Sequence, residues 1–249
     1  MRLILDEPRD AFMNMAVDEM LMGSAPCLRV YFWDQPSISI GYFQDVAATA
    51  QLFQCAKKNI PVVRRLTGGG LVSHGNDLTF SLVLASDNAF LPRDVKASYL
   101  KVTEALRAGL KDTYQELDYA RCKDLGAQRK RQTERVCFEQ PSCYDLLFNG
   151  KKVMGASQRR LNGVILHQSA VFLDMGRGEL TKKIIQGFEK NWKLSFEERP
   201  LTPEEIGRAE RINEERYSSK FWAFRAWPLP FSQNIPGNCK EALKACGHN

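Results

Sequence analysis

Three consecutive glycines, Gly68 to Gly70, lie between two apolar, strand-forming segments and constrain the fold of this chain most. Glycine loses more conformational freedom on folding than other residues, but it lets the backbone approach a ligand closely. Free backbone N–H groups in such a loop can hold an anion or an oxyanion. Arg64 and Arg65 come just before the glycines, and His74 follows them. These neighbours favour a ligand-binding loop over a plain turn.

The segments that flank this loop read as strands on both sides. Residues 61–65 precede the loop and residues 78–85 (LTFSLVLA) follow it. Both segments are rich in residues that favour strands. A nucleotide-binding P-loop instead joins a strand to a helix and ends in Gly-Lys-Ser/Thr. The residues after the glycines read LVSH, so the sequence excludes a P-loop.

Helical periodicity appears in several further segments. Apolar residues recur at helical spacing over 11–22 and 95–110, and 178–192 also reads as a helix. Asp45 is expected to cap a helix that runs to residue 57. Thr202-Pro203-Glu204-Glu205 starts another helix, which we expect to end near residue 217, because it combines a threonine cap, a proline and acidic first-turn residues.

Strand patterns fill most of the remaining chain. We predict strands over 2–6, 28–33, 37–41, 117–120, 143–148, 151–160 and 164–173. Asp34-Gln35-Pro36 suggests a hairpin between 28–33 and 37–41. Asn149-Gly150 and Asn162-Gly163 are type I′ turn signals, so the last three strands should form an antiparallel meander.

Taken together, these patterns predict an α/β (α+β) fold with one mixed, largely antiparallel sheet flanked by helices. Residues 1–227 should form a single domain, since no repeat or interdomain linker interrupts them. Residues 228–249 should form a loosely ordered tail, because Pro, Gly, Asn and Ser accumulate there.

The composition excludes several classes of protein. With 44% hydrophobic and 26% charged residues among 249, the chain is neither disordered nor fibrous. No apolar run approaches the roughly 18 residues that a membrane span needs, and residues 1–8 read as a strand rather than a signal peptide. We therefore expect a cytoplasmic protein. The seven cysteines show no CxxC spacing, which predicts that most are free thiols and indicates neither a zinc site nor a disulfide framework.

A basic segment runs from Arg121 to Arg135. It holds six lysines and arginines against two acidic residues. Such a segment is either a solvated loop or a docking surface for an acidic partner. No nucleic-acid-binding motif is present and aromatic residues do not alternate with the basic ones, so we expect no nucleic-acid partner.

Several ordered motifs resemble the superfamily of lipoate–protein ligases, octanoyltransferases and biotin ligases. Residues 64–74 (RRLTGGGLVSH) resemble its signature loop, and residues 150–156 (GKKVMGA) its lysine signature. Residues 14–19 and 39–44 are similar to its first helix and to the strand end beside it. The resemblance covers roughly residues 2–225 and implies the fold of the biotin/lipoate ligase catalytic domain.

Within this superfamily, residues 137–144 (CFEQPSCY) resemble the cysteine-dependent octanoyltransferases. The resemblance implies octanoyl (or lipoyl) transfer from acyl carrier protein, through a Cys137 thioester, to a lysine of a lipoyl-domain protein. The acceptor would be the glycine cleavage H protein or a dehydrogenase E2 subunit. The enzyme would be a monomer that needs no cofactor and contacts no membrane.

Three alternatives stay open. An ATP-dependent lipoate–protein ligase would act through lipoyl-AMP with ATP and Mg. An amidotransferase would move the acyl group between lipoyl proteins. A catalytically inactive carrier-binding module would have lost the chemistry altogether.

The expected site combines a nucleophile, a cation and an acyl slot. Cys137 is the expected nucleophile, since a nearby cation lowers a thiol pKa, whereas Cys143 is expected to be structural. Lys152 would stabilise the oxyanion and accept the proton of the incoming amine. The expected substrate-binding residues are Arg64, Arg65, Thr67, Gly68, Gly69, Gly70, His74, Gly155 and Ala156, and no metal site is expected.

Arg64 and Arg65 can be partly structural, with Asp18 or Glu19 as counter-ions.

The strand after the lysine signature departs from the family pattern. Relatives often carry Gln-His-Gly-Ser there, whereas residues 167–170 read His-Gln-Ser-Ala. A shift of one residue reverses the face of a strand side chain, so His167 is not expected in the site.

Overall fold

The structure, a computed structural model, describes residues 1–24, 26–45, 59–125 and 140–223. The expected helix over 46–57, the expected nucleophile Cys137, most of the basic segment and the expected tail 228–249 lie outside the described residues.

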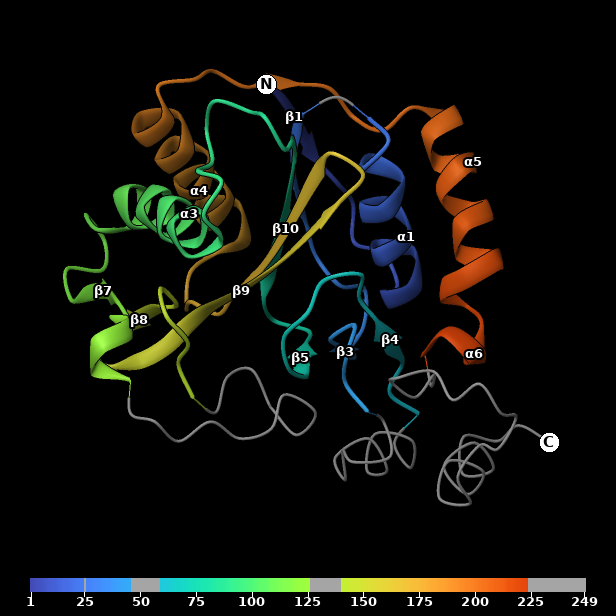
Figure 1. The fold of residues 1–249 in the computed structure, drawn as a ribbon, viewed down its shortest axis with the longest axis horizontal. Coiled ribbons are helices and arrows are strands. Elements are labelled where there is room, and N and C mark those ends of the chain that lie inside the picture. Colours follow the sequence, from blue (N-terminus) through green and yellow to red (C-terminus); the bar gives the residue numbers. More distant parts are fainter. Residues whose placement is uncertain (25, 46–58, 126–139, 224–249) are drawn as a thin grey trace.

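An eight-stranded sheet forms the centre of the protein, in the order β11-β1-β2-β6-β10-β9-β8-β7 (Figure 1). Its strands are β1 (Arg2–Leu5), β2 (Cys27–Tyr31), β6 (Leu78–Ala85), β7 (Leu117–Tyr119), β8 (Leu146–Phe148), β9 (Lys151–Leu161), β10 (Val164–Val171) and β11 (Glu197–Glu198). β1 is parallel to β2 and β11, and the other pairs are antiparallel. The predicted mixed, largely antiparallel sheet is confirmed.

The predicted meander is also confirmed. β8, β9 and β10 pair in antiparallel order, and both of their turns have the backbone that a type I′ turn requires. φ is +50° and +73° at Asn149-Gly150, and +49° and +77° at Asn162-Gly163.

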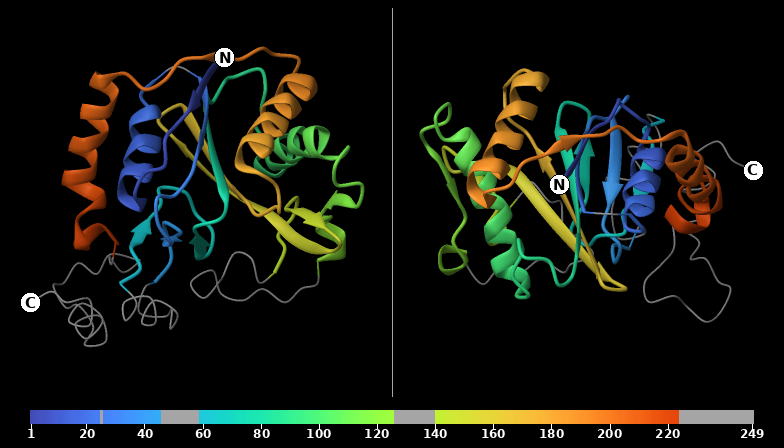
Figure 2. Two further views of the ribbon diagram at one scale, coloured as in Figure 1. Left: turned by 180° about the vertical axis from the view of Figure 1, so that it is seen from behind. Right: turned by 90° about the horizontal axis from the view of Figure 1, so that it is seen from above.

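Helices cover both faces of the sheet (Figures 1 and 2). α1 (Ala11–Leu21) and α5 (Pro203–Ile212) lie on one face, and α3 (Val95–Leu110) and α4 (Arg177–Trp192) on the other. Three further helical segments are short: η1 (Cys122–Asp124), η3 (Asn213–Tyr217) and α6 (Lys220–Ala223). The predicted threonine cap is present at α5, where Thr202 and Glu205 form a capping box. No helix in the described part of the chain is long and apolar enough to cross a membrane.

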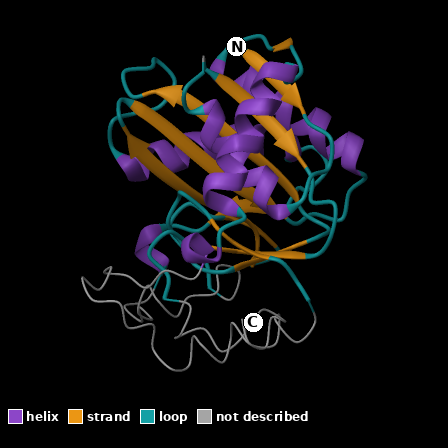
Figure 3. Ribbon diagram, turned by 90° about the vertical axis from the view of Figure 1, so that its right-hand side faces the viewer, coloured by secondary structure: helices purple, strands orange, loops and turns teal. Residues whose placement is uncertain are grey.

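A second sheet of three strands lies across one end of the large sheet (Figure 3). In it, β3 (Ser37–Ile40) is parallel to β4 (Val62–Arg64) and antiparallel to β5 (Val72–His74). The predicted hairpin between 28–33 and 37–41 is therefore wrong, because β2 pairs with β1 and β6 in the large sheet. Every residue of β2 and β3 is buried. Both strands thus need cover on two sides, which a lone hairpin cannot supply.

Close packing of α3 against α4 depends on two glycines. A Cβ at Gly109 would lie 1.9 Å from the carbonyl oxygen of Lys183, and one at Gly187 would lie 2.2 Å from that of Ala105. Both distances are far inside van der Waals contact, so only glycine allows the two helices to approach this closely.

Gly109→Ala should therefore lower the free energy of unfolding by about 1–3 kcal/mol or more, because the two helices must move apart. Chemical denaturation measures the change. Gly207→Ala on α5 is the matched control, since nothing lies within 4 Å of a Cβ there, and alanine is the better helix former. Equal destabilisation by both variants would contradict the packing argument.

Candidate active site

A pocket lies between the large sheet and the three-stranded sheet. Side chains from both sheets and from α1 surround it. Its lining consists of Met15, Tyr31, Trp33, Ser39, Arg65, Val72, His74, Thr79, Gly155, Ala156, Ser157, Gln168, Ser169 and Ala170. Four predicted substrate-binding residues, Arg65, His74, Gly155 and Ala156, are among them. Among the described residues, the pocket lining does not include Arg64, Thr67 or the three glycines.

Arg65 holds the glycine loop in place. Its Nη2 donates to the carbonyl oxygens of Gly68 and Gly70, both at 2.9 Å, and its Nη1 donates to Ser39 Oγ at 2.6 Å. The loop also presses on the end of β3, since a Cβ at Gly41 would lie 2.0 Å from the carbonyl oxygen of Gly69. Gly41 and Arg65 together fix the loop against β3.

Arg64 is fully buried and directed away from the pocket lining. Its guanidinium donates to the carbonyl oxygens of Gly41, Tyr42 and Gln44 and to that of Ala223. Arg64 therefore joins the chain after β3 to α6.

The predicted pairing of these arginines with Asp18 or Glu19 is wrong. Asp18 Oδ1 accepts from Arg29 Nη1 at 2.7 Å, and Glu19 pairs with Arg216. The first helix thus has arginine partners of its own, on β2 and in η3.

His74 lies in the pocket wall with a hydrogen bond on each ring nitrogen. Nδ1 is 2.8 Å from Asp77 Oδ2, and Nε2 is 2.6 Å from Ser39 Oγ. Its ring stacks on Trp33 with centroids 3.8 Å apart. Burial lowers the pKa of His74, although Asp77 opposes the shift. The imidazole is therefore neutral near pH 7.

A chain of hydrogen bonds joins the glycine loop to the sheet and to α1. Ser157 Oγ donates to Thr67 Oγ1, which donates to Gln168 Oε1 at 2.6 Å. Gln168 Nε2 in turn donates to Asp18 Oδ2 at 2.7 Å. Thr67 is thus a support beside the pocket rather than part of its lining.

Lys152 lies near the outer end of β9 in a buried ion pair. Its Nζ is 2.7 Å from Asp145 Oδ2, and the two side chains are 5% and 7% exposed. Burial raises the pKa of Asp145, although Lys152 and the Ser142 N–H oppose the shift. Lys152 is not among the described residues that line the pocket. It lies three residues along β9 from Gly155, which is.

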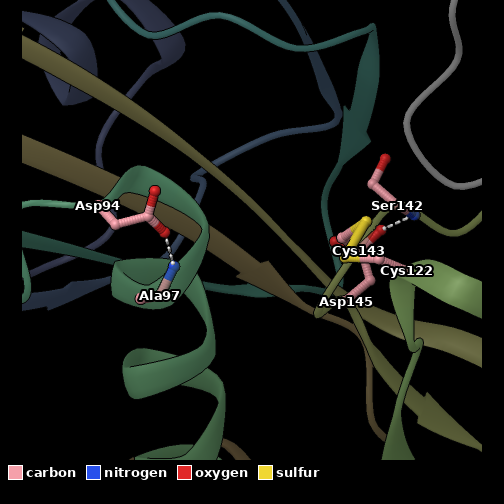
Figure 4. The surroundings of a disulfide bond; sticks show 6 residues. All are labelled: Asp94, Ala97, Cys122, Ser142, Cys143 and Asp145. Atoms are coloured by element: carbon pink, nitrogen blue, oxygen red, sulfur yellow. Dashed lines mark hydrogen bonds between the residues drawn. A yellow bond between two sulfur atoms is a disulfide. The ribbon is translucent and has the colours of Figure 1, made fainter.

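A disulfide joins Cys122 and Cys143 close to this ion pair (Figure 4). Ser142, whose N–H donates to Asp145 Oδ2 at 2.6 Å, is the neighbour of Cys143. These two cysteines are exceptions to the prediction that most of the cysteines are free thiols. Sequence spacing did not reveal the pair because η1 and the segment before β8 meet only in the fold. Cys27 is a free, buried thiol, and burial raises its pKa to about 12.

His167 faces away from the pocket, and Gln168 occupies the pocket face of β10. His167 Nδ1 accepts from Gln158 Nε2 at 2.9 Å, and Nε2 donates to Ser169 Oγ at 2.7 Å. Its ring stacks on Phe80. This placement agrees with the expected reversal of face.

Burial lowers the pKa of His167 to about 3, which predicts a loss of stability in acid. Between pH 6.5 and pH 3 the unfolded histidine binds a proton that the folded one does not. The free energy of unfolding should therefore fall by about 1.4 kcal/mol for each unit that the pH drops in this window. Denaturation of the wild type and His167→Gln at pH 7 and pH 5 tests this. Identical slopes in the two proteins would refute the assignment.

Sequence reasoning missed Ser39, Asp77 and Gln168 as site residues. Asp77 lies three residues after His74, a spacing that the sequence displays. Gln168 follows from the same alternation of faces that excludes His167. Ser39 carried no separate signal, because its position opposite His74 depends on the pairing of β3 with β5.

The comparisons with known proteins agree with this arrangement. Residues 10–200 match the sequence model of the lipoyl protein ligase A/B catalytic domain, which is more than half of the chain. The chain belongs to this family. Its members are enzymes, so the pocket and its loop are the candidate active site of a lipoyl protein ligase A/B catalytic domain.

The individual relatives are named for two activities, octanoyl transfer and lipoate ligation. The octanoyltransferase LipM of Moorella thermoacetica is 33% identical over 72% of this chain and 67% of its own length. A solved lipoate-protein ligase A with bound ATP is 26% identical, with a TM-score of 0.73 over 90% of this chain and 98% of its own. A bi-partite lipoate protein ligase of Thermoplasma acidophilum, studied with its E2 lipoyl domain, is 25% identical, with a TM-score of 0.71 over 94% of this chain and 98% of its own.

Proposed function

We propose that this enzyme transfers an octanoyl group in protein lipoylation, from acyl carrier protein to a lysine of a lipoyl-domain protein. The observation that carries the proposal is the likeness to an octanoyltransferase at 33% identity over most of both chains. Met15, Val72 and Ala170 give the pocket apolar walls against which an acyl chain can pack.

Cys137 is the proposed nucleophile. Its thiolate attacks the thioester carbonyl of the donor and the C–S bond to the carrier breaks, so the carrier leaves as a thiolate that takes up the proton Cys137 lost on ionisation. The neutral amine of the acceptor lysine then attacks the Cys137 thioester. The amide forms as the C–S bond breaks, and the departing Cys137 sulfur takes up the proton that the amine loses. Lys152 is proposed to stabilise both tetrahedral oxyanions. The transfer needs no cofactor, because the thioester is already activated.

The decisive experiment is intact-mass measurement after incubation with octanoyl acyl carrier protein, with and without ATP. We expect a hydroxylamine-labile adduct of one octanoyl mass without ATP, and no adduct on Cys137→Ala. Cys27→Ala is the matched control, because that thiol is buried and its pKa is raised. An adduct that persists in Cys137→Ala would falsify the assignment.

An ATP-dependent lipoate ligase is the second candidate. The likeness to a ligase that binds ATP, at a TM-score of 0.73, favours it. In that reaction the glycine loop and Lys152 would hold lipoyl-AMP, with ATP and Mg as cofactors. The same assay separates the two, because a ligase lipoylates its acceptor only with ATP and does so without Cys137.

The acceptor is proposed to be a lipoyl-domain protein, such as an E2 subunit or the glycine cleavage H protein. The Thermoplasma relative was studied with its E2 lipoyl domain, which supports this class of partner. Arg121 and Lys123 lie exposed at the start of the basic segment. Positive charge here would attract an acidic carrier or lipoyl domain. We also propose that the enzyme acts as a monomer in the cytoplasm.

A further inference from the structure

Ser39, His74 and Asp77 form a serine–histidine–aspartate chain in the wall of the pocket. Ser39 Oγ is 2.6 Å from His74 Nε2, and His74 Nδ1 is 2.8 Å from Asp77 Oδ2. The three residues come from β3, from β5 and from the turn after β5. Ser39 and His74 both border the pocket. This is the order of contacts by which a serine hydroxyl is activated as a nucleophile.

The surrounding hydrogen bonds fix where each proton lies. Asp77 accepts hydrogen bonds from the Gly75 N–H and from Thr79 Oγ1, and these bonds favour its ionised form although burial opposes it. Asp77 is therefore an acceptor, and His74 Nδ1 must donate to it. Because His74 is neutral, its Nε2 is an acceptor and the Ser39 hydroxyl donates to it. Both hydrogen bonds thus point in the direction that proton removal from Ser39 requires.

The carboxylate and the ring are both held rigidly. Asp77 Oδ1 accepts from the Gly75 N–H at 3.0 Å, and Oδ2 also accepts from Thr79 Oγ1 at 2.8 Å. Thr79 Oγ1 accepts from Trp33 Nε1, and the Trp33 ring stacks on His74. The imidazole is therefore fixed in plane and in tautomer before any ligand enters. Such preorganisation is typical of a catalytic centre.

Arg65 adds a cation beside the serine. Its Nη1 donates to Ser39 Oγ at 2.6 Å. A positive charge at this distance favours the alkoxide over the alcohol and can stabilise an oxyanion that forms next to it. Met15, Val72 and Ala170 line the same pocket, so an acyl chain would have apolar walls close to this hydroxyl.

We propose that Ser39, His74 and Asp77 are a second nucleophilic centre, which hydrolyses medium-chain acyl thioesters and esters that enter the pocket. Ser39 Oγ bonds to the carbonyl carbon as the C–S bond breaks, and the hydroxyl proton passes through His74 Nε2 to the leaving thiolate. Water then attacks the acyl-serine ester. His74 takes a proton from the water and returns it to Ser39 Oγ as the ester bond breaks, which releases the carboxylic acid.

This activity is independent of the proposed transferase reaction, since it does not use Cys137. The test is therefore made on Cys137→Ala. The first readout is release of p-nitrophenolate from p-nitrophenyl octanoate. The second is covalent labelling by a fluorophosphonate probe, which loses fluoride when an activated serine attacks its phosphorus. Peptide mass mapping then locates the label.

We expect hydrolysis above the buffer rate and a label on Ser39. Both should be lost in Cys137→Ala/Ser39→Ala, and His74→Gln should slow hydrolysis by about 10²–10⁴-fold. Ser73→Ala is the matched control on β5, because Ser73 is exposed and should keep full labelling. Ser39→Cys nearly preserves the volume of the side chain, so it should melt like the wild type and still lose the phosphonate label, which separates a lost serine hydroxyl from a lost fold.

Two results would overturn the proposal. One is a fluorophosphonate label on the wild type no stronger than on Ser39→Ala. The other is undiminished ester hydrolysis in folded Ser39→Ala, with folding checked by thermal melting. If Cys137→Ala abolished the octanoyl adduct while the Ser39 label stayed, both proposals would stand. If the adduct survived in Cys137→Ala but disappeared with Ser39→Ala, only the serine centre would stand.

Discussion

Replacement of Arg29 by methionine should lower the free energy of unfolding by about 3–5 kcal/mol, because it leaves buried carboxylates without their cation. Arg29 lies on β2 and is 0% exposed. Its guanidinium pairs with Asp6 Oδ2 and Asp18 Oδ1, both at 2.7 Å, and with Asn14 Oδ1 at 2.8 Å. The pair with Asp18 joins β2 to α1, beneath the residues that support the pocket.

Urea denaturation of the wild type and Arg29→Met measures this loss. The matched control is Arg199→Met, which removes an exposed pair with Glu197 at 3.4 Å. Exposed pairs contribute about 0–1 kcal/mol, so that variant should be nearly as stable as the wild type. A loss below about 1 kcal/mol in Arg29→Met would show that solvent or another cation compensates for Arg29.

Local structure was predictable from this sequence because its signals lie within a few residues of each other. The Asn-Gly turns at 149–150 and 162–163 place β8, β9 and β10 in register. The helical period over 95–110 matches the bounds of α3. Strand partners were less accessible. β3 is buried along its whole length. The alternation of its apolar and polar residues therefore could not reveal that β3 pairs with β4 and β5 rather than with β2.

The candidate site was predictable where family motifs carried it, as for Arg65, His74, Gly155 and Ala156. The contacts that these residues make were not predictable. Arg65 was expected to meet a carboxylate, but carbonyl oxygens of its own loop and Ser39 satisfy it. Buried guanidinium groups need several acceptors. Because every residue has a main-chain carbonyl, the sequence does not indicate which of them will accept from Arg65. The counter-ion of Lys152 was hidden for a different reason, since Asp145 approaches it only after β8 pairs with β9.

Lys152→Met should slow octanoyl transfer by about 10²–10³-fold, the usual cost of losing a group that stabilises an oxyanion. In the structure its Nζ is held by Asp145 Oδ2 at 2.7 Å, so the ammonium must turn toward the reacting carbonyl or act from where it lies. Single-turnover transfer from octanoyl acyl carrier protein measures the loss. Lys151→Met is the matched control, because that neighbour is exposed and should transfer normally.

Asp145→Asn distinguishes the two ways in which Lys152 can act. If Asp145 only restrains the ammonium, the amide should weaken this restraint and transfer should be as fast as in the wild type or faster. If the ion pair itself is the working arrangement, transfer should slow toward the rate of Lys152→Met. Normal transfer by Lys152→Met would remove Lys152 from the mechanism altogether. Other donors would then have to stabilise the oxyanion. The backbone N–H groups of the glycine loop are candidates, because this loop joins Arg65 to His74 and both of these residues line the pocket.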